Sequence, residues 1–154
     1  MGETGLDTFR TGEAGRAAQE RSFRAHIQIA KDTGKALVIH DRDAHADILR
    51  VLDGEGAPDT VVLHCFSGDE SFAVECVKRG YVLSFAGTVT FKNAQNLRDA
   101  VQVTPVEQIL VETDAPYLIP LTVRALAAVK EVDVDELCAA ISATGERAFG
   151  GWGG

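Results

Sequence analysis

The sequence has 154 residues, and its 45% hydrophobic and 25% charged content is typical of one globular domain, which excludes a disordered or fibrous chain. The length falls short of the roughly 250 residues that a complete eight-fold β/α barrel needs. A formal net charge of −8 at pH 7 argues against a broad surface that binds phosphates by charge alone. A bound divalent metal would bring its own positive charge, so this balance does not exclude phosphate chemistry.

The cysteines are odd in number and have no Cys-x-x-Cys spacing; they are Cys65, Cys76 and Cys138. A disulfide framework or a thiolate zinc site is therefore not expected, and a reducing compartment is favoured. No apolar run approaches the roughly 20 residues that span a bilayer, and the first residues lack the features of a signal peptide. We expect a cytoplasmic protein that does not associate with membranes.

Short apolar runs that read as β-strands recur along the chain, at residues 36–40, 61–64, 81–85 and 109–114. Residues 2–7 are consistent with the end of a strand that precedes them. The runs lack strict polar alternation, as expected of parallel strands that are covered on both faces. Helical spacing of apolar residues fills the segments between them, beginning with Phe23, Ile27 and Ala30.

Two later helices have candidate N-caps, Asn93 and Asp133. Alternation of strands and helices, with no repeat or linker, predicts the α/β class with parallel strands and right-handed crossovers. We expect a single domain over residues 1–150 and a flexible glycine-rich tail at residues 151–154.

Chemically capable side chains occur where the predicted strands stop. His40 and His64 end two runs, Asp114 follows the last, and Glu3 lies in the first segment. The carboxyl ends of parallel strands emerge on one face, so these four residues are expected to converge. Two imidazoles and two carboxylates suit a divalent ion such as Zn²⁺ or Mn²⁺, and a bridging carboxylate could hold two ions. The set predicts metal-assisted hydrolysis.

Each of these residues also has a structural interpretation. A histidine at a strand end can bond a neighbouring carbonyl group, Glu3 can project from a turn, and Asp114 can belong to a turn or helix cap. The joint interpretation depends on all four falling at equivalent topological positions. Two other histidines, His26 and His45, are expected at the surface or in packing. Motifs for a nucleophilic serine or a phosphate-binding glycine loop are absent from the sequence.

Five motifs resemble, in order, the signatures of the TatD family of metal-dependent deoxyribonucleases. They are GETGLD at 2–7, VIHDRDA at 38–44, HCFSG at 64–68, GYVLSFAG at 80–87 and ETDAPYL at 112–118. The resemblance runs from residue 2 to about residue 149. It implies a TIM-type β/α barrel, here a partial one with about five C-terminal strand–helix units.

The resemblance also implies roles for individual residues. Glu3 would bridge two divalent ions (Mg, Mn or Zn), and His40 and His64 would complete the ligands of the second ion. Asp114 would bind the first ion and help to activate the attacking water, so Glu3 and Asp114 are the expected catalytic residues. Arg42 would contact a substrate phosphate, since its guanidinium group matches phosphate oxygens.

The sequence departs from the family pattern in two places. The strand that in the family carries a His-x-His pair, upstream of the Glu3 motif, has no counterpart here. The Pro- and Arg-rich loop that the family has after Leu118 is also missing, since residues 121–124 look like the following helix. We expect either a longer protein that is represented in part, or a truncated product that is inactive or needs a partner.

The family resemblance implies that the intact protein cleaves DNA phosphodiester bonds, as a 3′–5′ exonuclease on single-stranded ends, and acts as a monomer. One alternative is a related metal-dependent hydrolase of another ester, amide or lactone. Another is a non-catalytic fragment that binds one metal ion or a partner. Stoichiometric metal binding without hydrolysis would identify the fragment.

Overall fold

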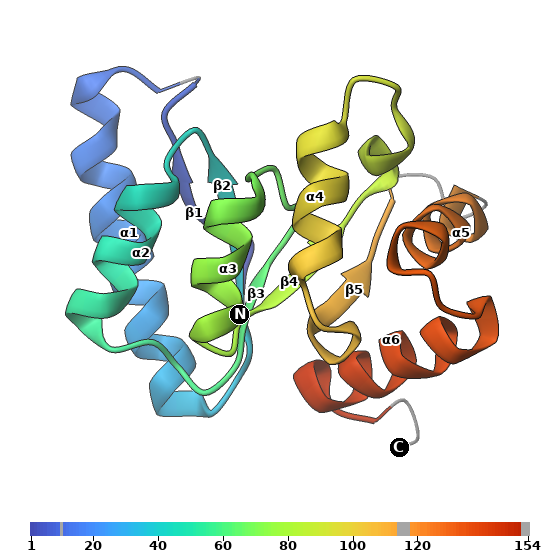
Figure 1. The fold of residues 1–154 in the computed structure, drawn as a ribbon. Helices are drawn as coiled ribbons and strands as arrows, with labels where there is room; N and C mark the ends of the chain where they lie inside the picture. Colours follow the sequence, from blue (N-terminus) through green and yellow to red (C-terminus); the bar gives the residue numbers. More distant parts are fainter. Residues whose placement is uncertain (10, 114–117, 152–154) are drawn as a thin grey trace. The chain divides into compact units, whose positions relative to one another are not determined.

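The computed structural model describes residues 1–9, 11–113 and 118–151 (Figure 1). They form two compact units, Met1–His64 and Cys65–Gly154, and each unit is described by itself. Both are built from parallel strands and helices, which confirms the predicted α/β class. None of the described helices combines the length and apolarity needed to cross a membrane.

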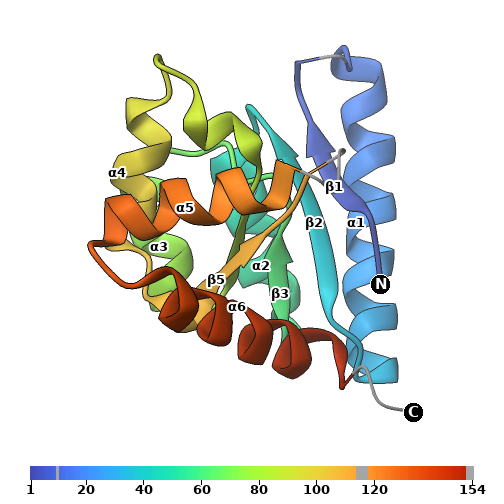
Figure 2. The ribbon, with the colours of Figure 1, turned by 90° about the vertical axis from the view of Figure 1, so that its right-hand side faces the viewer.

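The first unit contains three parallel strands in the order β1-β2-β3, which are Thr4–Asp7, Leu37–Arg42 and Val61–Leu63. Helices α1 (Glu13–Thr33) and α2 (His45–Glu55) contact each other and the strands (Figure 2). The predicted apolar face of α1 is confirmed, because Phe23, Ile27 and Ala30 are buried. The helix ends at Gly34, which has a left-handed φ of 63°.

Strand β2 extends two residues further than the sequence pattern predicted. Asp41 and Arg42 continue the strand because they pair with Leu6 and Asp7 of β1. Burial alternates along β2, so that Leu37, Ile39 and Asp41 are buried, whereas the side chains between them are half-buried. His40 and Arg42 therefore lie on the same face of the strand.

The second unit contains the parallel pair β4 (Val82–Phe85) and β5 (Ile109–Val111). Its helices are α3 (Glu70–Lys78), α4 (Gln95–Val103), α5 (Ile119–Lys130) and α6 (Val134–Phe149), with short 3-10 helices η1 (Gly87–Thr90) and η2 (Val106–Gln108). Phe66 anchors an aromatic cluster, since its ring centroid lies 5.6 Å from that of Phe72 and 5.5 Å from that of Phe85. Helices that follow one another in the chain, from α3 to α6, contact each other.

One of the two predicted helix caps is correct. Asp133 accepts hydrogen bonds from the backbone of Asp135 and Glu136 and so caps α6. Asn93 is not the cap of α4, because the helix begins one residue later, with Ala94 in the cap position and no side-chain cap bond. The predicted flexible tail stays a prediction, since residues 152–154 lie outside the described residues.

Candidate metal centre

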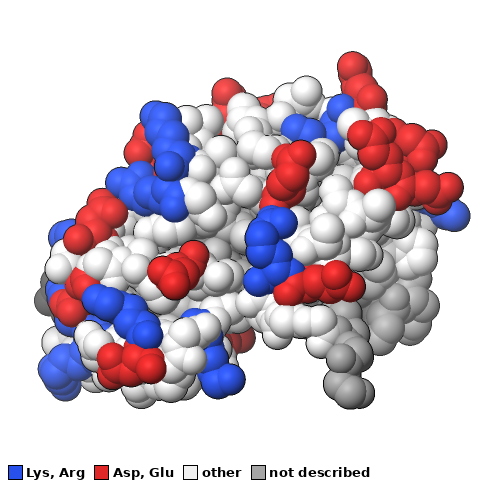
Figure 3. All heavy atoms as spheres, turned by 90° about the horizontal axis from the view of Figure 1, so that it is seen from below, with Lys and Arg blue, Asp and Glu red and all other residues white. Residues whose placement is uncertain are grey.

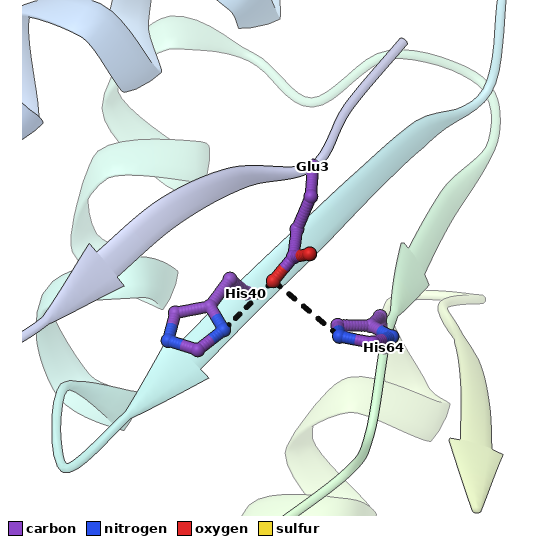
Figure 4. Close-up of side chains that lie close together, drawn as sticks. All are labelled: Glu3, His40 and His64. Atoms are coloured by element: carbon purple, nitrogen blue, oxygen red, sulfur yellow. Dashed lines mark ion pairs between the residues drawn. The ribbon is translucent and has the colours of Figure 1, made fainter. Parts of the chain in front are cut away.

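Three residues predicted from the sequence come together in the first unit (Figure 4). Glu3 immediately precedes β1, His40 lies in β2 and His64 immediately follows β3. Oε1 of Glu3 lies 2.9 Å from Nδ1 of His40 and 3.4 Å from Nε2 of His64. One potential ligand atom from each residue lies within 4.8 Å of the others, an arrangement that could hold a metal ion.

Backbone hydrogen bonds on both sides of β2 bring these residues together. The N–H of Val38 donates to the carbonyl of Met1 at 2.8 Å, which places the segment before β1 beside β2. On the other side, the N–H of His64 donates to the carbonyl of Ile39 at 3.0 Å. Glu3 and His64 therefore flank the strand that carries His40.

Gly5 allows the close approach of β1 to β2 that this arrangement needs. It pairs with His40 in the strand register and has a φ of 146°. A Cβ atom at this position would lie only 1.9 Å from the carbonyl oxygen of His40. Any side chain would force the strands apart, and with them Glu3 and His40.

The three side chains are open to solvent, which a metal and a substrate both require. The exposed fraction is 48% for Glu3, 36% for His40 and 33% for His64. A carboxylate oxygen and two imidazole nitrogens form a donor set for a borderline divalent ion. An open cleft of about 500 Å³ adjoins the group, and Glu3, Asp7, Gln19 and His40 are among its lining residues.

A second carboxylate reaches His40 from β1. Oδ2 of Asp7 lies 3.4 Å from Nε2 of His40, and the Asp7 side chain is only 19% exposed. Gln19 of α1 holds the Asp7 backbone by accepting a hydrogen bond from its N–H at 3.0 Å. The sequence reasoning missed Asp7, although Glu3, Gly5 and Asp7 are spaced by two and so share one face of the segment.

The other predicted site residues do not join this group among the described residues. The guanidinium carbon of Arg42 lies 4.2 Å from the ring centroid of Phe9, a cation–π contact, and its contact with a phosphate stays a prediction. Asp114 lies outside the described residues. Its neighbour Glu112 accepts a hydrogen bond from the backbone of Cys65 at 3.0 Å.

His45 has a more specific role than the sequence suggested. Its Nδ1 atom lies 2.7 Å from Oδ2 of Asp41, a carboxylate that is only 6% exposed. The other oxygen of Asp41 accepts a hydrogen bond from the N–H of Ala44 at 3.2 Å. Asp41 thus satisfies a backbone donor at the start of α2, and its second oxygen accepts a hydrogen bond from His45. His26 is half-buried on α1, and its Nδ1 atom lies 2.7 Å from the carbonyl oxygen of Ser22 one turn earlier.

The chain is similar to known proteins of one family. The family model described as "TatD related DNase" matches residues 1–150. The chain is 46% identical to a Mycobacterium tuberculosis protein named as an uncharacterized metal-dependent hydrolase TatD, over 99% of this chain and 65% of the relative. It is 38% identical to a Citrobacter koseri protein named 3′-5′ ssDNA/RNA exonuclease TatD, over 78% of this chain and 46% of the relative.

The fold is also that of a solved structure. The crystal structure of YjjV, a TatD homolog from Escherichia coli, matches with a TM-score of 0.89 and 26% identity, over 96% of this chain and 62% of that chain. This likeness is consistent with the predicted partial TIM-type barrel. The chain thus spans about half to two thirds of the length of these proteins.

Proposed function

Because the chain belongs to the TatD-related DNase family, we propose that it carries the metal site of a hydrolase that cleaves nucleic-acid phosphodiester bonds. The observation that supports this most directly is the group of Glu3, His40 and His64, whose ligand atoms lie within 4.8 Å of one another. We further propose that the enzyme removes nucleotides from the 3′ ends of single-stranded DNA.

The residues present fit a divalent metal such as Mg²⁺, Mn²⁺ or Zn²⁺. His40 and His64 lie on either side of the Glu3 carboxylate (Figure 4), with Nδ1 of His40 2.9 Å and Nε2 of His64 3.4 Å from Oε1 of Glu3. Glu3 has a second carboxylate oxygen, which we propose as a ligand of a second ion. We propose that Asp114 is a ligand of the first ion and that it helps to activate the attacking water as a general base.

When bound, a divalent ion would supply Lewis-acid activation of water and offset negative charge on the phosphate oxygens. The residues of the chain position the reactants around it. Arg42 lies on the same face of β2 as His40 and is the proposed contact to a non-bridging phosphate oxygen. Its stacking on Phe9 would limit the rotamers of the guanidinium group before a substrate binds.

The name of the Citrobacter koseri relative supports single-stranded nucleic acid as the substrate class. The net charge of −8 is unfavourable for contacts with many phosphates along a strand. It is compatible with contacts to the few phosphates at a strand end. On the face drawn in Figure 3, acidic side chains gather at the upper right, and elsewhere basic and acidic side chains alternate without a broad basic patch. Few phosphate contacts and a shallow dependence of affinity on salt follow from the net charge of −8. The proposal includes a cytoplasmic monomer; the odd number of cysteines and their lack of Cys-x-x-Cys spacing support the reducing compartment.

The test follows release of nucleotides from a 3′-labelled single-stranded oligonucleotide by the full chain. Reactions contain Mg²⁺, Mn²⁺, Zn²⁺ or EDTA, and the variants are His64→Ala and Glu3→Gln. The matched control is Glu146→Gln, which removes the same charge from an exposed position on α6. We expect metal-dependent release that both site variants lose and the control retains.

Two results would overturn the proposal in different ways. Release that persists in EDTA or in His64→Ala would place the activity elsewhere. Stoichiometric metal binding without release, measured by titration calorimetry, would leave the metal site in place and reject hydrolysis of this substrate by the chain.

A further inference from the structure

An exposed aromatic ring borders a cavity in the second unit. Phe91 follows η1 and is 58% exposed. The cavity holds about 370 Å³, within the range of small-ligand sites, and Cys65, Gly87, Phe91, Leu118, Leu121 and Thr122 are among its lining residues. Leu121 is also 53% exposed, so apolar side chains face solvent around the cavity. A ligand that entered the cavity could therefore contact these apolar side chains without a change of the backbone.

The segment that carries Phe91 is held in place by hydrogen bonds. Arg98 of α4 donates to the carbonyl of Phe91 at 2.8 Å, of Val89 at 3.2 Å and of Lys92 at 3.3 Å. Val89 is buried and anchors the segment, and Thr90 donates its hydroxyl to the carbonyl of Gly87 at 2.7 Å. The ring is therefore presented on a fixed backbone, which lowers the entropy cost of binding a partner.

Thr122 adds a polar group to this cavity. Its side chain is fully buried, and Oγ1 has no hydrogen-bond partner among the described residues. Oγ1 lies 3.7 Å from the position that a Cβ atom on Gly87 would occupy, so the hydroxyl faces the η1 segment. A buried hydroxyl without a partner is unfavourable, and a ligand with a polar edge would satisfy it.

These features match one chemical class of ligand, a nucleobase. A base has a flat apolar face that stacks on an aromatic side chain and a polar edge that forms hydrogen bonds. The described lining of the cavity is uncharged, which suits a base better than a phosphate. Lys92 is exposed directly after Phe91 and offers a cation to the backbone of the same strand.

We propose that Phe91 is a stacking platform for one base of single-stranded nucleic acid, with the edge of that base directed to the hydroxyl of Thr122. This rests on the proposed function for its substrate class. The stacking platform adds Phe91 as the residue that would contact a base, whereas the metal site of the proposed function would contact a phosphate. Arg98 is a positioning residue, since it acts by holding the carbonyl groups on both sides of the ring.

The test measures binding without hydrolysis. A short fluorescein-labelled oligothymidylate is titrated with the full chain in EDTA, in parallel with an abasic oligonucleotide of the same length and charge. The variants are Phe91→Ala, Phe91→Trp and the matched control Phe149→Ala, which removes a ring that is 52% exposed at the end of α6. Thermal unfolding of each variant establishes that it is folded.

Phe91→Ala is expected to weaken binding of oligothymidylate about 5- to 150-fold, the range for loss of one base–aromatic stack. Phe91→Trp and Phe149→Ala are expected to bind like the original chain, and the abasic oligonucleotide is expected to bind all variants equally. Trp152 is the single tryptophan of the sequence. In a Trp152→Phe background, oligothymidylate should therefore quench the fluorescence of Phe91→Trp, whereas the abasic strand should not.

The platform and the proposed nuclease function fail in distinguishable ways. Equal affinity of Phe91→Ala and the original chain for oligothymidylate would overturn the platform, whatever the outcome of the nucleotide-release assay. Equal weakening for the abasic strand would also overturn it, because the ring would then act through the sugar-phosphate backbone. Base-dependent binding without metal-dependent release would support the platform and reject hydrolysis.

Discussion

Oδ2 of Asp7 lies 3.4 Å from Nε2 of His40, on the opposite side of the imidazole from Nδ1, which lies 2.9 Å from Glu3. A carboxylate behind a metal-binding histidine fixes the ring orientation and raises the basicity of the ligating nitrogen. Asp7 is well placed for this because it is largely buried and its backbone is held by Gln19. We infer that Asp7 positions His40 and does not itself act on the substrate.

Asp7→Asn should weaken binding of Mn²⁺ or Zn²⁺ about 10- to 100-fold, the usual cost of losing such a partner. Titration calorimetry at pH 7 measures the change. Asp59→Asn, at an exposed position between α2 and β3, is the control and should leave metal affinity unchanged. Unchanged affinity in Asp7→Asn would mean that the ring orientation depends on Glu3 and backbone packing alone.

Gly5→Ala tests whether the close approach of β1 and β2 assembles the site. The added Cβ would lie 1.9 Å from the carbonyl oxygen of His40, and the φ of 146° is unfavourable for alanine. We expect a loss of about 3 kcal/mol or more in the free energy of unfolding, together with loss of metal binding. Urea unfolding measures the first and titration calorimetry the second.

Gly54→Ala is the matched control for this substitution. Gly54 lies within α2, and a Cβ atom there would meet no atom within 4 Å. Alanine at an open helical position is expected to stabilise the protein by about 0.5–1 kcal/mol. A similar loss of stability in both variants would contradict the steric explanation for Gly5.

The convergence of Glu3, His40 and His64 was predicted from the carboxyl ends of parallel strands, but only His64 directly follows the end of its strand. His40 lies within β2 and Glu3 precedes β1, so the register of β1 against β2, with Gly5 opposite His40, is what brings Glu3 beside His40. Asp7 was missed although its spacing of two from Gly5 and Glu3 places it on the same face, because its contact with His40 also depends on the register of β1 against β2. Asp114, predicted by the same reasoning as the others, lies outside the described residues.

Element boundaries were less predictable than elements. β2 continues through Asp41 and Arg42 because β1 supplies their hydrogen-bond partners, although both residues are polar. The position of Phe91 at the surface could not be predicted either, because phenylalanine in a short apolar run usually indicates a core position. Only the structure shows that Arg98 donates hydrogen bonds to the carbonyl groups of Phe91 and Lys92 and so fixes the backbone that presents the Phe91 ring to solvent.

Glu20 should make stability depend on pH. It receives hydrogen bonds from Arg50 and Arg24, which lower the pKa of its carboxyl group from 4.5 to about 2. A lowered pKa in the folded state contributes stability above pH 4.5 that is lost as the pH falls toward 2. Glu20→Gln should therefore lower the melting temperature by a few degrees at most at pH 7, because the pairs are partly exposed.

The difference between the original chain and Glu20→Gln should shrink as the pH falls from 4.5 toward 2, and it should also shrink in high salt. Thermal unfolding over this pH range measures it, with Glu146→Gln as the control. A difference that stays constant with pH would show that the substitution acts through packing between α1 and α2 rather than through charge.

Metal binding should stabilise the first unit, because Glu3 before β1, His40 in β2 and His64 after β3 come together only when the unit is folded. A ligand that binds only the folded state at 100 times its dissociation constant contributes about 2.7 kcal/mol to stability. Addition of Mn²⁺ should therefore raise the melting temperature by several degrees, and EDTA should reverse the change. His40→Ala should lose this response, whereas Glu146→Gln should keep it. An equal rise in His40→Ala would assign the metal to other groups and reject the site formed by Glu3, His40 and His64.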